Sequence, residues 1–167
     1  MINKDITLHK ALGASLIELV MIILIVGALA VMPLINWPGT GLNIDAQAKQ
    51  FADDIRYTQS LSQSKAERYR IVEASATSYQ ILNSSGTPIT FATGSTAITL
   101  NSGLSFGTWT NLSSNLIAFD GRGTPYLSTG TPGTALSAAT SYTVTITGGG
   151  NTKTITITPI TGMVLVQ

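Results

Sequence analysis

The feature that most constrains this chain is an apolar run near its N-terminus. The run from Leu16 to Ile35 reads LIELVMIILIVGALAVMPLI, and only one charge, Glu18, and one proline, Pro33, interrupt it. About 20 helical residues rise about 30 Å, which matches the hydrocarbon thickness of a bilayer. We therefore expect residues 14–36 to form a membrane-spanning helix, followed by a single globular domain in this chain of 167 residues.

The flanking charges predict how this helix is oriented. Lys4 and Lys10 precede the run, whereas the first charge after it is Asp45. Positive residues favour the cytoplasmic side, so the N-terminus is expected in the cytoplasm and the remainder outside it. A secretory signal peptide is the alternative, because Ala28-Leu29-Ala30 has the form of its cleavage box.

Glu18 argues against an ordinary signal peptide. A carboxylate near the bilayer centre costs about 2 to 3 kcal/mol on insertion scales, and less near the interface, so it is seldom present without a function. Two roles remain open for Glu18. It can reach toward the lipid headgroups, or it can pair with an amine inside an apolar medium.

The residues before and after Glu18 carry a more specific signal. Gly13-Ala14-Ser15-Leu16-Ile17-Glu18-Leu19-Val20 resembles the class III leader junction of type IV pilins and type II secretion pseudopilins. The resemblance implies that residues 1–13 are a leader, that prepilin peptidase cuts between Gly13 and Ala14, and that Ala14 becomes N-methylated. Glu18 then stands fifth in the mature chain, as in that family. Alanine replaces the usual phenylalanine at the first position, and serine replaces threonine beside it.

A cut after Gly13 would also give Glu18 a partner. The new α-amine of Ala14 would lie about one helical turn from the Glu18 carboxylate, and charge-assisted pairs are strong in apolar surroundings. Pairing of Glu18 in one subunit with Ala14 of its neighbour would set the axial register of a filament. We therefore expect Glu18 to act in assembly.

A second helix is predicted after a break at Asn36-Trp37-Pro38-Gly39-Thr40-Gly41. Apolar or small residues then recur on one helical face, which predicts an amphipathic helix within residues 37–66. The members of this face are Ile44, Ala48, Phe51, Ala52, Ile55, Ser62 and Ala66.

The remainder, residues 67–167, has the pattern of strands and turns. Short alternating runs are separated by Gly, Ser, Asn and Pro. Strands are expected at Tyr69–Ala74, Ser78–Leu82, Ile89–Ala92, Ala97–Asn101, Leu104–Thr108, Leu116–Asp120, Tyr142–Thr147, Lys153–Thr158 and Met163–Val166. Alternation in the hairpin that contains Gly148-Gly149-Gly150-Asn151 points Val144, Ile146, Ile155 and Ile157 to a core and the threonines outward.

The predicted fold class is α+β: a long N-terminal transmembrane and amphipathic helix packed on an antiparallel β-sheet or small β-sandwich head. This order, helix first and then strands, resembles the GspH/FimT group of minor pseudopilins. Three segments strengthen the resemblance, namely residues 54–60, 117–125 and 157–164. It implies a pilin-like head.

Catalysis is not expected, because the chain has no cysteine and its only histidine, His9, lies ahead of the proposed cut. Without these residues there is no Ser-His pair and no conventional zinc or copper site, so we expect neither a cofactor nor a metal. Asp53 and Asp54 are expected to solvate a helix. Asp120 is expected in a tight turn with Arg122 exposed.

Charge also argues against nucleic acid as a partner. The formal net charge is +1, and only 10% of residues are charged, against about 25% in an average soluble domain. Arg122 and Lys153 could neutralise only about two phosphates. Lys65, Arg68 and Arg70 form the one basic cluster, which Glu67 and Glu73 interrupt.

The leading functional prediction is a minor pilin or pseudopilin subunit. Its expected partners are prepilin peptidase, other pilins or pseudopilins and the inner-membrane assembly platform. It is expected to cross the bacterial inner membrane once, with a periplasmic head, and then to enter a pilus or pseudopilus. Two alternatives are a tip module that binds DNA, a surface or a secreted substrate, and a membrane-anchored or secreted β-protein without a filament.

Overall fold

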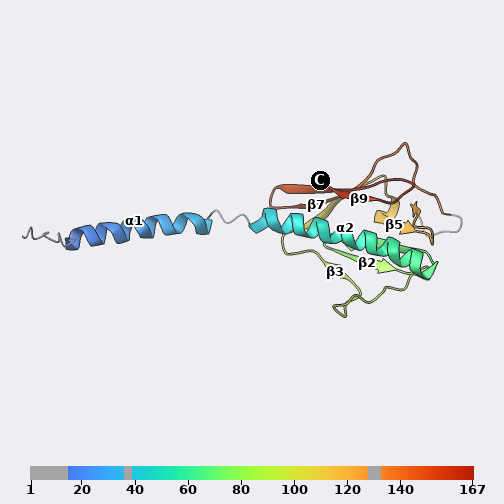
Figure 1. Ribbon diagram of the computed structural model, residues 1–167, viewed down its shortest axis with the longest axis horizontal. Coiled ribbons are helices and arrows are strands. Elements are labelled where there is room, and N and C mark those ends of the chain that lie inside the picture. Colours follow the sequence, from blue (N-terminus) through green and yellow to red (C-terminus); the bar gives the residue numbers. More distant parts are fainter. Residues whose placement is uncertain (1–14, 36–38, 128–132) are drawn as a thin grey trace, which may run out of the picture. The chain divides into compact units, whose positions relative to one another are not determined.

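A computed structural model describes residues 15–35, 39–127 and 133–167, in two compact units, Met1–Pro38 and Gly39–Gln167 (Figure 1). The first unit contains helix α1, Leu16–Ile35. Judged on the described residues, none of the helices combines the length and the apolar character needed to cross a membrane. The second unit, here called the head, contains helix α2, Gly39–Lys65, and all the strands.

Helix α2 buries the face that the sequence predicted. Ile44, Ala48, Phe51, Ala52, Ile55 and Ser62 are all buried. Thr58 and Ser62 lie on the same face, and their hydroxyls donate to the carbonyls four residues earlier, at 2.7 and 3.0 Å. Serine and threonine are tolerated inside a buried helix face when they bond in this way. Ser62 also accepts the Tyr69 N–H at 3.1 Å, which ties the helix to the strand that follows.

Ala66 does not belong to this face, because α2 ends one residue before it. The Glu67 N–H donates to the Ser62 carbonyl and the Ala66 N–H to the Gln63 carbonyl, which is the bond pattern of a Schellman cap. Ala66 adopts φ +50° at the position that usually holds glycine. The turn sets Ala66 outside the buried stripe, and its side chain is exposed.

The head contains two antiparallel sheets. The five-stranded sheet has the order β3-β2-β1-β5-β6, and the four-stranded sheet has the order β4-β7-β8-β9. Their bounds are β1 Tyr69–Ser75, β2 Ser78–Leu82, β3 Ile98–Thr99, β4 Ser105–Thr110, β5 Leu116–Phe119, β6 Pro125–Tyr126, β7 Tyr142–Gly148, β8 Asn151–Ile157 and β9 Val164–Val166, with a short 3-10 helix at Ser113–Asn115. The predicted α+β class is therefore confirmed, with two sheets rather than one.

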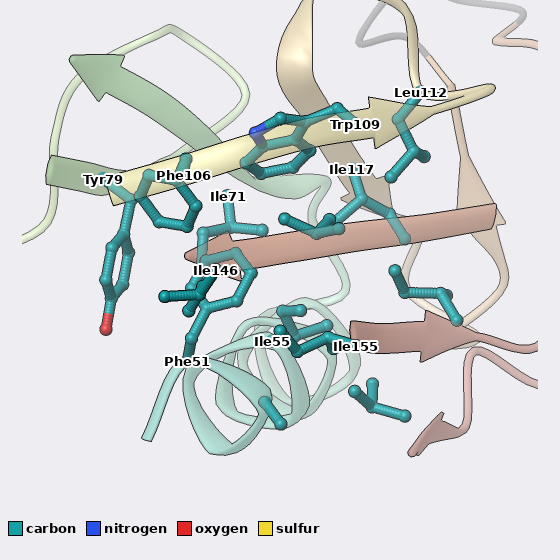
Figure 2. Packing of buried hydrophobic residues seen from close by; sticks show 14 of the residues in the cluster. Phe51, Ile55, Ile71, Tyr79, Phe106, Trp109, Leu112, Ile117, Ile146 and Ile155 are labelled. Carbon is teal, nitrogen blue, oxygen red and sulfur yellow. The ribbon is translucent and has the colours of Figure 1, made fainter. Parts of the chain in front are cut away.

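One hydrophobic core joins α2 to both sheets. The helix contacts β1 and β5 of the larger sheet and β7, β8 and β9 of the smaller one. Phe51 of α2 lies at the centre, with its ring edge-to-face against Tyr79, Phe106 and Trp109 at centroid distances of 4.9, 5.1 and 5.9 Å. Figure 2 shows these rings converging with isoleucines from both sheets above the helix. Such a ring carries a large share of core stabilisation, because it buries a large apolar area and adds favourable edge contacts.

The threonine-rich hairpin forms as predicted. Val144, Ile146, Ile155 and Ile157 are fully buried. Gly148 pairs with Asn151, so Gly149 and Gly150 alone form the turn, with φ of +57° and +78°. A two-residue turn with positive φ at both positions matches the twist of the flanking strands.

The strand predicted at Ile89–Ala92 is wrong. The Ile89 N–H still reaches the Ile81 carbonyl at 2.9 Å, but the Phe91 N–H donates to the Ser95 carbonyl and closes a turn. Pro88 has no N–H to donate to the hydrogen-bond ladder of a sheet, and it makes only an isolated bridge to Leu82. Alternation alone does not supply a neighbouring strand, so this segment crosses the edge of the sheet as a loop.

Strand β2 has its predicted bounds, and the other predicted strands that form are shifted by one or two residues at one or both ends. Strand β3 shortens to Ile98–Thr99, and β4 begins and ends later than predicted because a bulge lies between Phe106 and Trp109. The Thr145 hydroxyl accepts the Thr108 N–H at 2.7 Å inside this bulge. The extra residue turns both aromatic side chains into the core.

Candidate functional site

Of the three candidate residues near the N-terminus, the structure describes one, Glu18. Gly13 and Ala14 lie outside the described residues, whereas Glu18 lies in the first turn of α1 and is exposed. The Glu18 N–H donates to the Ser15 carbonyl at 2.9 Å and approaches the Ser15 hydroxyl at 3.4 Å. Ser15 is thus the N-cap of α1, and Glu18 occupies the third helical position, where a negative charge favours the helix dipole.

This cap is a feature that the sequence reasoning missed. Ser15-Leu16-Ile17-Glu18 has the Ser-x-x-Glu spacing of a capping box directly before an apolar run, so the signal was present in the sequence. The cap defines where the helix begins. It also holds the Glu18 carboxylate at the N-terminal end of the helix, close in sequence to the proposed junction.

Helix α1, taken by itself, has a run of apolar side chains around Glu18. Each large apolar side chain from Leu16 to Val26 is exposed, with fractions that range from 45% to 82%. A helix that is apolar on all sides needs lipid or other helices around it. Exposed apolar side chains in such number are typical of an association surface.

The acidic residues of α2 have two different environments. Asp53 is exposed and pairs with Arg56, as the prediction of a solvated helix requires. Asp54 departs from that prediction, because it is partly buried and accepts a hydrogen bond from the Tyr79 hydroxyl of β2. Burial raises the pKa of the Asp54 carboxyl, while the Tyr79 hydrogen bond opposes that shift. The pair joins α2 to the larger sheet.

Asp120 and Arg122 are placed as predicted. One Asp120 carboxylate oxygen accepts the N–H groups of Arg122 and Thr124, both at 2.9 Å, which closes a tight turn after β5. The side chain of Arg122 is exposed. The other carboxylate oxygen accepts the Tyr126 hydroxyl at 3.3 Å, so the role of Asp120 is to fix the turn beside β6.

The basic cluster of α2 and β1 is spread over separate contacts. The guanidinium of Arg68 lies 4.4 Å from the centre of the Tyr126 ring, and Arg70 donates to the Asn83 carbonyl at 3.5 Å. Glu67 accepts the Ser84 hydroxyl and Glu73 accepts the Asn115 amide. Among the described residues, no group of three or more acidic side chains is arranged to hold a metal ion. These side chains stabilise the junction between helix and sheet.

Comparison of the sequence with models of known protein families gives a match. The sequence model of a family described as "Type II transport protein GspH" matches residues 47–162, which is more than half of the chain. A search of curated proteins finds no match.

Two solved structures are similar to this chain. The minor pseudopilin EpsH from the type 2 secretion system of Vibrio cholerae has a TM-score of 0.53 and 11% identity, over 75% of this chain and 96% of that chain. The type IV minor pilin FimU of Pseudomonas aeruginosa has a TM-score of 0.49 and 16% identity, over 78% of this chain and 91% of that chain. At these identities the likeness to EpsH establishes the shared fold.

Proposed function

The chain belongs to the family of the type II transport protein GspH, and we propose that it is processed by prepilin peptidase and then assembles as a minor subunit of a pseudopilus or type IV pilus. Subunits of this class are structural and non-enzymatic, and they associate with other pilins or pseudopilins in a filament. The family match over residues 47–162 carries the proposal. The junction at Gly13 and the apolar helix α1 support it.

Maturation is the first part of the proposal. Cleavage between Gly13 and Ala14 would leave Ser15 as the second residue and N-cap of α1, with Glu18 as the fifth residue. The Ala14 amine would be N-methylated. The sequence around Gly13 supports the proposed junction.

Anchoring is the second part. We propose that the run Leu16–Ile35 holds the processed subunit in the bacterial inner membrane, with its N-terminus cytoplasmic and its head periplasmic, until the inner-membrane assembly platform inserts it into the filament. Lys4 and Lys10 before the run support this orientation. In the filament, the same apolar surface would pack against the helices of other subunits.

N-terminal sequencing of the mature chain tests maturation directly. The expected result is a single N-terminus at methylated Ala14. Maturation after Ala30, or no maturation, would contradict the proposal and would favour a secreted or simply anchored β-protein.

Glu18→Gln tests the assembly role of the carboxylate. Glutamine keeps the residue type that a capping box accepts and removes the charge, so the start of α1 should be preserved while incorporation into filaments falls. Ser15→Ala is the matched control, because it removes the cap and keeps the carboxylate. Equal incorporation of Glu18→Gln and the unmodified subunit would exclude the proposed pairing with the Ala14 amine.

A further inference from the structure

Two neighbouring turns of the head are fixed to α2 by glutamine side chains. The Gln59 amide donates to the carbonyls of Gly123 and Thr161, both at 2.8 Å, and the Gln63 amide donates to the Arg122 carbonyl at 3.2 Å. One turn lies between β5 and β6 and the other between β8 and β9. We call residues 120–124 together with residues 158–163 the paired turns.

The packing around these amides leaves little freedom. Gly123 and Gly162 adopt φ of +83° and +67°, and a Cβ atom on them would lie 2.3 and 2.8 Å from the Gln59 or Gln63 amide nitrogens. Side chains other than glycine would therefore both strain the backbone and displace the glutamines. The paired turns form one preorganised structure against the C-terminal half of α2.

The second turn contains a strained residue. Ile160 adopts φ +69°, and the Thr161 N–H bonds the Pro159 carbonyl at 2.8 Å across it, which is the hydrogen bond of a γ-turn. A positive φ at the centre of a γ-turn is rare and strained, and it is especially unfavourable for a β-branched side chain. Strain of this kind persists where the surroundings enforce it, and it is concentrated at functional sites.

The strained turn displays apolar side chains to solvent. Ile160 is 66% exposed, Met163 is 52% exposed, and Leu165 of β9 is 44% exposed. Within the described part of the head, the other large apolar residue exposed to this degree is Tyr57, on α2. Exposure of one apolar side chain is ordinary, but exposure together with backbone strain at Ile160 favours a role in contact with another molecule.

Charge identifies the chemistry of that molecule. From Ala74 to the end of the chain the charged residues are Asp120, Arg122 and Lys153. Asp120 binds backbone N–H groups, and Lys153 pairs with Asp45 at 3.1 Å. In the part of the chain that the structure describes, the Arg122 guanidinium makes no salt bridge and its side chain is exposed. Arg122 lies in one of the paired turns and Ile160 in the other, and the Gln59 amide binds a carbonyl of each turn.

We propose that the paired turns are a docking surface for a neighbouring pilin-class subunit, which presents a carboxylate to Arg122 beside an apolar patch that covers Ile160 and Met163. Arginine and methionine are enriched in protein interfaces, and arginine is among the residues that most often dominate the binding energy. Preorganised turns also lose little conformational entropy on binding. This inference rests on the proposed function, because it names the partner of the head in the filament.

The absence of cysteine makes a single-site crosslinking test possible. Met163→Cys, labelled with a maleimide benzophenone in cells that assemble the filament, places the reporter on the docking surface. Thr93→Cys is the matched control, because Thr93 is exposed in the turn that the Phe91 N–H closes. Irradiation of sheared filaments should link the Met163→Cys reporter to a pilin-class subunit, identified by mass spectrometry, more efficiently than the control.

Two substitutions then test the contact itself. Adding Arg122→Ala or Ile160→Gly to the Met163→Cys chain should lower the crosslink yield about tenfold. Thr93→Glu lowers the net charge by one unit, as Arg122→Ala does, and it should leave the crosslink yield unchanged. Ile160→Gly relieves the strained φ, so its thermal unfolding midpoint should not fall, and a loss of yield cannot then be assigned to misfolding.

The outcomes separate this inference from the proposed function. If the chain is present in the filament fraction but both substitutions leave the yield unchanged, the docking surface is wrong and the filament role stands. Crosslinks that reach only proteins outside the pilin class would also overturn the proposed partner. If the Thr93→Cys chain is absent from the filament fraction, the proposed function fails, and the docking inference fails with it.

Discussion

The hydrogen bond between Tyr79 and Asp54 gives the first prediction at the scale of single residues. Tyr79 is buried, and its hydroxyl satisfies a carboxylate that is itself partly buried. Tyr79→Phe keeps the ring that packs on Phe51 and removes the donor. We expect the free energy of unfolding at pH 7 to fall by about 1 to 2 kcal/mol, measured by urea denaturation.

The same pair predicts how stability depends on alkaline pH. Burial raises the pKa of the Tyr79 phenol far above its usual value, and the Asp54 carboxylate opposes a second negative charge. Above about pH 10 the unfolded chain releases a proton that the folded chain keeps, so stability should fall by up to about 1.4 kcal/mol per pH unit.

Denaturation of the unmodified chain and Tyr79→Phe between pH 8 and 11.5 tests this linkage. The free energy of unfolding should fall less steeply with pH in Tyr79→Phe than in the unmodified chain. The fall should not vanish, because burial also raises the pKa of Tyr69. Identical slopes in the two proteins would show that Tyr79 ionises as easily in the folded state as in the unfolded state.

Ala66 supplies a second prediction at this scale. It holds φ +50° at the glycine position of the α2 cap, and its side chain is exposed, so the methyl group adds strain without packing. Ala66→Gly should raise the free energy of unfolding by about 1 kcal/mol, measured by thermal or urea denaturation. Ala76→Gly is a useful comparison, because Ala76 is exposed outside a positive-φ position and glycine there should not stabilise.

At the scale of secondary-structure elements, Phe51 decides how α2 is held on the sheets. The ring meets three aromatic side chains from β2 and β4. Phe51→Ala should therefore cost about 3 to 5 kcal/mol, because it removes buried area and leaves a cavity. Tyr57→Ala on the same helix is the control and should change stability by less than about 0.5 kcal/mol, since Tyr57 is half exposed. Equal losses in the two variants would contradict the central position of Phe51.

The elements also differ in how well the sequence predicted them. The buried stripe of α2 and the hairpin of β7 and β8 depend on periodic side chains within a few residues, and both were predicted correctly. Strand β6 was not predicted, since Pro125 and Tyr126 show no alternation and pair only because β5 lies beside them. The segment at Ile89 fails for the opposite reason, because it alternates but has no strand to complete a ladder.

At the scale of the whole molecule, the head should fold without residues 1–38. Every member of its hydrophobic core lies between Ile44 and Val164. A fragment of residues 39–167 should therefore unfold cooperatively, with the same thermal midpoint as the head of the full chain in detergent. A broad, non-cooperative transition in the fragment would show that α1 contributes to the stability of the head.

The sequence by itself determined the features that depend on neighbouring residues. The apolar run with Glu18, the amphipathic face of α2 and the threonine hairpin follow from local spacing, because side-chain periodicity and composition fix them without reference to the fold. The junction at Gly13 stays a prediction from the residues around it. The absence of cysteine and the scarcity of charge also directed the functional prediction toward assembly.

Only the tertiary structure decided which distant groups meet. The Tyr79 and Asp54 side chains are 25 residues apart, and Gln59 bonds Thr161 across 102 residues. Such contacts form because burial of one shared core brings the two sheets onto α2, and no local pattern specifies which polar groups then face each other. The paired turns, with Ile160 and Arg122 held outward, are a product of that packing.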